Sequence, residues 1–118
     1  MNIEEFRDYC LSKKYVIECF PFDTTTLVFK VANKMFALSC LENIPAGVNL
    51  KCDPERAIEL REEYSGIVAG FHMSKKHWNT ITIEGNIPNS FIKELIDHSY
   101  NLVVNGMTKK LQKELGFI

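Results

Sequence analysis

The segment from Leu27 to Leu41, LVFKVANKMFALSCL, decides the fold that the sequence predicts. Two runs rich in aliphatic, β-branched and aromatic side chains, Leu27 to Val31 and Met35 to Leu41, flank the short stretch Ala32-Asn33-Lys34. Runs of this composition are typical of strands. Asn33 tolerates the positive φ that a tight hairpin turn requires. We therefore predict a β-hairpin here, with its two strands antiparallel.

The chain before this hairpin predicts one helix and one further strand. Asn2 followed by Glu5 matches a capping box, in which each side chain bonds the other residue's backbone amide. Apolar residues recur at helical spacing behind this cap, so we expect a helix over residues 2–13. Residues 15–20 are aromatic and β-branched enough for a strand, which Pro21 ends.

The chain after the hairpin contains further strands and helices with clear start and stop signals. Asp53-Pro54 is typical of a helix start, because aspartate caps free backbone amides and proline suits the first helical position. Ile58 is expected on the buried stripe of that helix. The expected elements are a strand at 48–51, a helix from Asp53-Pro54 to Gly66, a strand at 80–83, a long helix from Pro88 to Gly106 and a short basic helix at 107–115.

This order predicts an α+β fold: a single antiparallel sheet, built mainly as a meander, with helices packed on one side. The chain has 118 residues, which suits one domain over residues 1–118 with a core of its own. The opposite face of the sheet is expected to be polar. Its candidate residues are Thr24, Thr26, Lys30, Lys34, Asn49, Lys51, Thr80 and Thr82.

The composition excludes several classes of protein. Apolar residues make up 46% and charged residues 25% of the chain, an ordinary mix for a globular domain. No apolar run is long enough to cross a bilayer, and the amphipathic first helix does not resemble a signal peptide, so we expect a cytoplasmic protein without membrane contact. The four cysteines are widely spaced and lack a C-x-x-C pair, which favours free thiols.

Residues 71–79, FHMSKKHWN, are the most unusual stretch for function. Two histidines, two adjacent lysines and the single tryptophan fall within it, and no acidic residue occurs between residues 64 and 83. The net charge of the chain is only −1, which counts against strong non-specific binding of nucleic acid. Acidic residues concentrate in the expected helices, however, so the strands and their connections are basic. Such segregation can create one positive face on a nearly neutral molecule.

Several separated stretches resemble the MmcQ/YjbR family of small bacterial proteins. The most specific stretch is His72 to Asn79, and the resemblance covers almost the whole chain. The other stretches are Phe20 to Asp23, Val28 to Val31, Lys34 to Leu38, Asn49 to Pro54, Ile87-Pro88 and Ser99-Tyr100. The resemblance implies a compact α+β fold in which two β-rich wings accompany the helices, with some likeness to the frataxin-type sandwich. It also implies DNA binding, because members are commonly described as DNA-binding proteins of a double-wing shape.

The basic cluster predicts contacts with nucleic acid. Lysine ammonium groups neutralise phosphates, and an indole ring stacks on an unpaired base for about 1 to 3 kcal/mol. The two histidines would act as hydrogen-bond donors that respond to pH. An alternative is that the tryptophan anchors the next strand in the core while the lysines are merely solvated. The candidate residues are Lys75, Lys76, His77 and Trp78, supported by Lys30, Lys34, Lys51 and His72.

A second hypothesis is a binding module for a small anionic ligand or a protein partner. A cleft between residues 20–23 and residues 72–78 would combine aromatic walls with cationic groups, as ligand pockets commonly do. A nearly neutral chain suits this hypothesis better than binding of duplex DNA. The sequence leaves both hypotheses open.

Catalysis and metal binding find little support in the sequence. His72 and His77 are five apart, so they would not share one face of a helix, and no close cysteine or carboxylate completes a zinc site. Asp23 is a candidate for orienting one of these histidines as a base. No hydrolase, zinc-protease or phosphate-loop motif is present. We therefore expect a protein that is not an enzyme and requires no metal or other cofactor.

Overall fold

The computed structural model describes residues 1–70 and 73–118 of the chain. Its described strands form one sheet in the order β1-β2-β3-β4-β6-β5, in which every neighbouring pair is antiparallel. The elements are α1 (Ile3–Leu11), β1 (Val16–Cys19), β2 (Thr26–Val31), β3 (Lys34–Cys40), β4 (Gly47–Lys51), α2 (Pro54–Glu63), β5 (Ile67–Ala69), β6 (Trp78–Thr82), α3 (Asn89–Asn105) and α4 (Lys109–Glu114).

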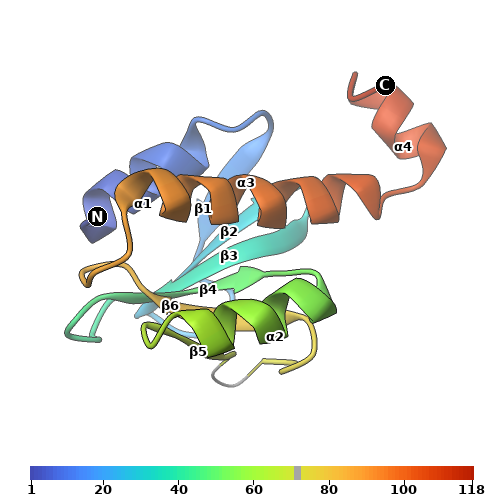
Figure 1. The fold of residues 1–118 in the computed structure, drawn as a ribbon. Helices are drawn as coiled ribbons and strands as arrows, with labels where there is room; N and C mark the ends of the chain where they lie inside the picture. Colours follow the sequence, from blue (N-terminus) through green and yellow to red (C-terminus); the bar gives the residue numbers. More distant parts are fainter. Residues whose placement is uncertain (71–72) are drawn as a thin grey trace.

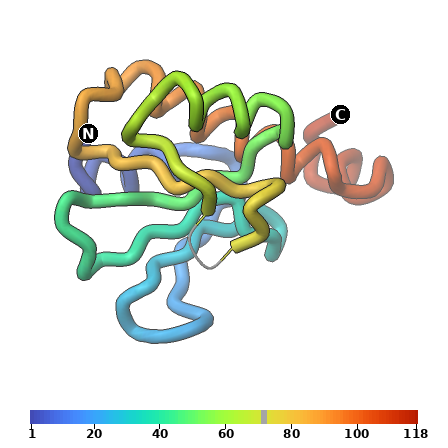
Figure 2. The backbone as a smooth tube through the Cα atoms, turned by 60° about the horizontal axis from the view of Figure 1, so that its bottom comes forward, coloured from blue at the N-terminus to red at the C-terminus, as the bar shows by residue number. Residues whose placement is uncertain are grey.

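The helices α1, α2 and α3 cover one face of this sheet (Figure 1). Their apolar stripes share a core with the strand residues that point toward them, such as Phe29, Phe36, Leu50 and Ile81. Phe6 of α1 packs edge-on against Phe29, with 5.8 Å between the ring centroids. Figure 2 shows α1 behind the strands and the segment that leads into β6 in front of them. The predicted α+β fold, with one antiparallel sheet and helices on one side, is confirmed.

The predicted hairpin is formed by β2 and β3, the two middle strands of the meander from β1 to β4. Ala32 and Asn33 have φ values of 47° and 66°, so both central residues of the two-residue turn are left-handed. A shift in register between Phe29 and Lys30 places an extra residue in β3. Because of this bulge, Phe29 and Phe36 both reach the helix-side core, while Lys30 pairs with Met35 on the other face.

Local sequence signals predicted the starts of α1 and α2 correctly. Asn2 caps α1 through the amide of Glu5 at 2.8 Å, and the Glu5 side chain accepts from the amide of Asn2 at 3.2 Å. Asp53 caps α2, with Pro54 as the first helical residue. Both observations confirm the predicted helix starts, because a cap depends on neighbouring residues alone.

Two expectations about single elements differ from the structure, and the face of the sheet away from the helices is less polar than predicted, because it carries a small apolar core. Strand β5 was not expected, because it has only three residues between two glycines and its pairing with β6 is a long-range contact. Ile58 was expected in the core but is 54% exposed, so the buried face of α2 is carried by Ala57 and Leu60 instead. In the described part of the chain, no helix combines the length and apolar character needed to cross a membrane.

Candidate binding surface at one end of the sheet

The register of the strands brings the predicted lysines to the same end of the sheet. Lys30 lies near the end of β2, Lys34 begins β3 and Lys51 ends β4, where it pairs with Trp78 at the start of β6. Neighbouring strands are about 4.8 Å apart, so the row from β2 to β6 is roughly 14 Å wide. Lys30 and Lys51 lie on the face away from the helices, because their cross-strand partners Met35 and Trp78 pack there.

The turn that carries Lys75 and Lys76 lies at this same end. The amide of Trp78 donates to the carbonyl of Ser74 at 3.0 Å, which closes the turn. The amide of Cys52, just past β4, donates to the carbonyl of His77 at 2.8 Å. These two bonds hold the turn beside the end of β4. We name this group the lysine rim; its members are Lys30, Lys34, Lys51, Lys75 and Lys76.

All lysines of the rim are at least partly exposed to solvent. Lys34, Lys75 and Lys76 are exposed, whereas Lys30 and Lys51 are half-buried. The ammonium of Lys75 donates to the carbonyl of Gly70 at 3.2 Å. Among the described residues, no carboxylate forms an ion pair with any lysine of the rim. Their charges are therefore not neutralised within the described part of the chain.

Trp78 is buried, and the predicted exposed indole is wrong. Its side chain is 8% exposed and packs against Val28 and Leu38 in a small second core on the face away from the helices. Met35 and Met73 pack against this group from the side. Val28 and Leu38 point away from the main core and need an apolar cover, which the indole provides. The ring is therefore unavailable for stacking on a base.

Arg61 of α2 fixes the turn that precedes β6. Its Nε donates to Oδ1 of the buried Asn79 at 2.6 Å, and its Nη2 donates to the carbonyl of Trp78 at 3.3 Å. The same Nη2 also donates to the carbonyl of Lys75. On the other side of the turn, a Cβ at Gly70 would lie 2.8 Å from the Cβ of Trp78, so only glycine fits at this position.

Of the histidines and the aspartate discussed for the predicted cleft, His77 and Asp23 lie in the described part of the chain. His77 is exposed, and His72 lies outside the described residues. The Asp23 carboxylate accepts from the amides of Thr25 and Thr26 at 2.9 and 2.6 Å, and these bonds lower its pKa below the ordinary value. Asp23 thus closes its own turn, a role different from orienting a histidine. No group of three or more His, Cys, Asp or Glu side chains that could hold a metal ion occurs among the described residues.

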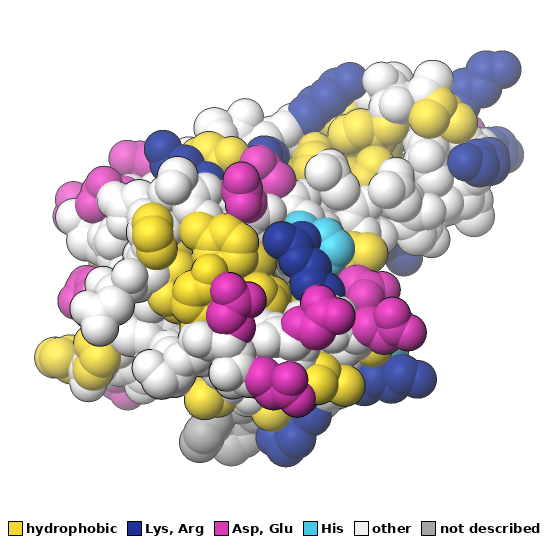
Figure 3. Space-filling view, viewed as in Figure 1, with side chains coloured by type: hydrophobic (Ala, Val, Ile, Leu, Met, Phe, Trp, Pro, Cys, Tyr) yellow, Lys and Arg dark blue, Asp and Glu magenta, His cyan; other side chains and the backbone are white. Residues whose placement is uncertain are grey.

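The opposite end of the sheet carries acidic residues. Asp23, Glu42 and Glu84 follow the strands β1, β3 and β6, whose ends are aligned by the strand register. We name these residues the acidic rim. Figure 3, which looks onto the helix layer, shows Lys and Arg side chains gathered over α4 and acidic side chains over α2. The lysine rim and the acidic rim thus lie at opposite ends of the strands, whereas the sequence predicted acidic helices and basic strands with basic connections.

His98 links α3 to the start of α2. Its Nε2 accepts from the amide of Asp53 at 3.1 Å. Burial, followed by the nearby Arg56 charge, lowers the pKa of His98 below its ordinary value of 6.5. A protonated ring can no longer accept the bond, because both of its nitrogens then donate.

The His98 contact predicts a loss of stability in acid. The unfolded chain binds a proton at His98 more readily than the native protein, so the stabilisation is complete above pH 6.5 and is lost as the pH falls below that value. Denaturant unfolding between about pH 5 and pH 8 measures this effect. The His98→Gln variant, which keeps an acceptor but does not titrate, should lose this part of the pH dependence. If the free energy of unfolding depended on pH in the same way in both proteins, His98 would not be the group responsible.

Comparisons with known proteins find relatives over nearly the whole chain. The family model YjbR matches residues 11–102. The uncharacterized protein YjbR of Escherichia coli strain K12 is 35% identical over 116 residues, which cover 98% of both chains. The uncharacterized protein YbdF of Escherichia coli O157:H7 is 36% identical over 113 residues, covering 95% of this chain and 92% of the relative.

Solved structures with the same fold include two bacterial proteins. The Deinococcus radiodurans protein DR2400, which has a DUF419 domain, superimposes with a TM-score of 0.92 at 41% identity over 98% of this chain and 88% of its own. A Pseudomonas syringae protein superimposes with a TM-score of 0.76 at 29% identity, covering 86% of this chain and 98% of its own. The arrangement of sheet and helices is therefore shared with experimentally determined structures.

Proposed function

The chain belongs to the YjbR family, and from this premise we propose that it is a non-enzymatic protein that binds DNA by contacting phosphates through its lysine rim. The observation that carries this proposal is the convergence of Lys30, Lys34, Lys51 and the Lys75–Lys76 turn at one end of the sheet. We also expect the protein in the cytoplasm, where free thiols such as those of its four cysteines persist.

The supporting argument is electrostatic. Each ammonium group that approaches a phosphate releases a condensed counterion, and this release favours binding at low salt. A row roughly 14 Å wide, spanning four adjacent strands, can contact several phosphates along one backbone. Because no carboxylate of the described residues pairs with these lysines, binding breaks no ion pair within that part of the chain.

The buried position of Trp78 limits the kind of recognition that we propose. Without an exposed indole at the rim, stacking on unpaired bases contributes nothing from this residue. Phosphate contacts carry no information about base sequence. We therefore propose binding with little preference for base sequence. The net charge of −1 disfavours binding over the whole surface, and the acidic rim repels phosphates.

The salt dependence of DNA binding tests this proposal. With about four phosphate contacts, affinity should fall roughly a hundredfold when the salt concentration rises from about 50 mM to about 200 mM. The double variant Lys34→Ala, Lys76→Ala should lower the slope of log affinity against log salt by about two units. Both side chains are exposed, so the fold should be unaffected. Fluorescence anisotropy with a labelled duplex measures both quantities.

Lys93→Ala provides the matched control. Lys93 is exposed on α3, where its ammonium lies 5.3 Å from the centre of the Tyr9 ring in the helix layer. Its removal should leave the slope unchanged. Equal slopes for wild type and the double variant, or no binding at about 50 mM salt, would overturn the proposal. Thermal stabilisation by inorganic phosphate without binding of DNA would also overturn it and assign the rim to a small anion.

A further inference from the structure

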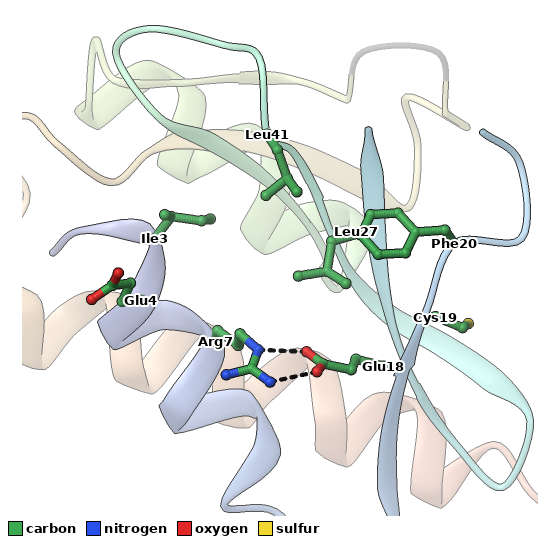
Figure 4. A pocket seen from close by; sticks show the side chains of 8 residues that line it. All are labelled: Ile3, Glu4, Arg7, Glu18, Cys19, Phe20, Leu27 and Leu41. Carbon is green, nitrogen blue, oxygen red and sulfur yellow. Dashed lines mark hydrogen bonds and ion pairs between the residues drawn. The ribbon is translucent and has the colours of Figure 1, made fainter. Parts of the chain in front are cut away.

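A pocket lies at the other end of the sheet, beside α1 and the outer strand β1. Its volume is about 440 Å³, within the usual range for sites that receive a side chain or a small ligand. Figure 4 shows apolar side chains on most sides of the hollow, with the Arg7–Glu18 pair closing one side. The lining residues are Ile3, Glu4, Arg7, Glu18, Cys19, Phe20, Leu27 and Leu41.

The charges around the pocket favour a cation. Arg7 is bound by Glu18 through two hydrogen bonds, from Nε at 2.7 Å and from Nη2 at 2.5 Å. This bidentate pair neutralises the guanidinium. Glu4 forms no ion pair with a described residue, so the lining residues carry one net negative charge. The acidic rim, which follows the strand ends at this side of the sheet, adds further negative charge.

Two loops next to the pocket carry further exposed apolar side chains. Phe20 and Leu41 line the pocket, while Phe22 and Ile44 are 64% and 95% exposed on the same loops. The amide of Leu41 donates to the carbonyl of Thr25 at 2.8 Å, which holds the two loops side by side. Exposed apolar groups clustered beside a pocket are typical of protein interaction sites.

We propose that this pocket and the two loops are the docking surface for a segment of a partner protein that carries a large apolar residue next to a lysine or arginine. The apolar residue fills the pocket between Ile3, Leu27 and Leu41. The neighbouring cation faces Glu4 and the acidic rim. A peptide fits the observations better than a small molecule, because the loops that carry Phe20 and Leu41 also carry the exposed apolar residues Phe22 and Ile44. This surface is separate from the lysine rim.

Selection from a random peptide library displayed on phage tests the proposal. Enriched peptides should contain a Leu, Ile, Met, Phe or Trp within about two positions of a Lys or Arg, since the anchor and the charge are adjacent in the pocket. A synthetic peptide with the enriched sequence then serves as the probe for anisotropy measurements. Leu41→Ala should weaken its binding at least about tenfold.

Ile58→Ala is the matched control, because Ile58 is 54% exposed on α2 and Leu41 is 46% exposed. It should leave peptide affinity unchanged, as should the double variant Lys34→Ala, Lys76→Ala of the lysine rim. Glu4→Gln should weaken binding, and its effect should fade at high salt. Enrichment of acidic peptides, no enrichment, or equal effects of Leu41→Ala and Ile58→Ala would overturn the proposal. Binding of octylammonium without any enriched peptide would overturn it in favour of a small amine.

Discussion

Trp78→Ala should lower the free energy of unfolding by about 3 to 5 kcal/mol. The indole covers Val28 and Leu38, which are 0% and 5% exposed on the face of the sheet away from the helices. Its removal leaves a cavity that the rigid strands cannot close, and it exposes both aliphatic side chains to water. Denaturant unfolding followed by circular dichroism measures the change, since the variant has no tryptophan to report fluorescence.

Trp78→Phe is the matched control for this substitution. A phenyl ring still covers most of Val28 and Leu38. The substitution should therefore lower the free energy of unfolding clearly less than Trp78→Ala does. DNA binding by the phenylalanine variant should equal that of wild type, because the buried ring makes no contact with DNA in our proposal. A variant that keeps its stability but loses DNA binding would show that the indole is a contact surface instead.

Arg61→Ala should cost about 2 to 4 kcal/mol of unfolding free energy, the second largest effect that we expect. The substitution leaves the buried Asn79 side chain without the guanidinium that bonds its Oδ1. It also frees the carbonyls of Lys75 and Trp78, so the turn before β6 loses its attachment to α2. Thermal and denaturant unfolding measure the loss, and proteolysis of the native protein should locate it at this turn.

Arg56→Ala controls for the loss of charge from the same helix. Arg56 is only half-buried, and its side chain has no hydrogen bond to a described residue. Its removal should therefore cost well under about 1 kcal/mol. The stability of Arg61→Lys should lie between those of wild type and Arg61→Ala, because a lysine ammonium cannot reproduce the planar guanidinium that reaches several acceptors. Equal effects of Arg61→Ala and Arg56→Ala would show that the turn does not depend on Arg61.

The sequence predicted those parts of the fold that depend on adjacent residues. The caps at Asn2 and Asp53 and the turn at Asn33 were all recognisable, because each requires a particular side chain within a few positions. Strand β5 was not recognisable. Its three residues become a strand only through pairing with β6, which enters the sheet between β4 and β5 after the intervening turn.

The candidate surfaces were predictable to different degrees. The lysines were identified from an uneven distribution of charge, and the strand register then brought them together at one end. The face on which Trp78 lies could not be predicted, since a shift of one residue moves a side chain to the other face of a strand. Of the residues that line the pocket, only Phe20 belonged to the cleft that the sequence predicted. The walls of the pocket come from α1, β1, β2 and the segment after β3, and the Arg7–Glu18 pair spans eleven positions without any motif.

The lysine rim and the acidic rim lie at opposite ends of the strands, so these two groups contribute a charge dipole directed along the sheet. A polyanion at a distance exerts little net pull on a protein of charge −1. It does exert a torque, which turns the positive pole toward the polyanion before any contact forms. Diffusing molecules would thus arrive already oriented, with the apolar loops of the negative pole facing away and still accessible to a second partner.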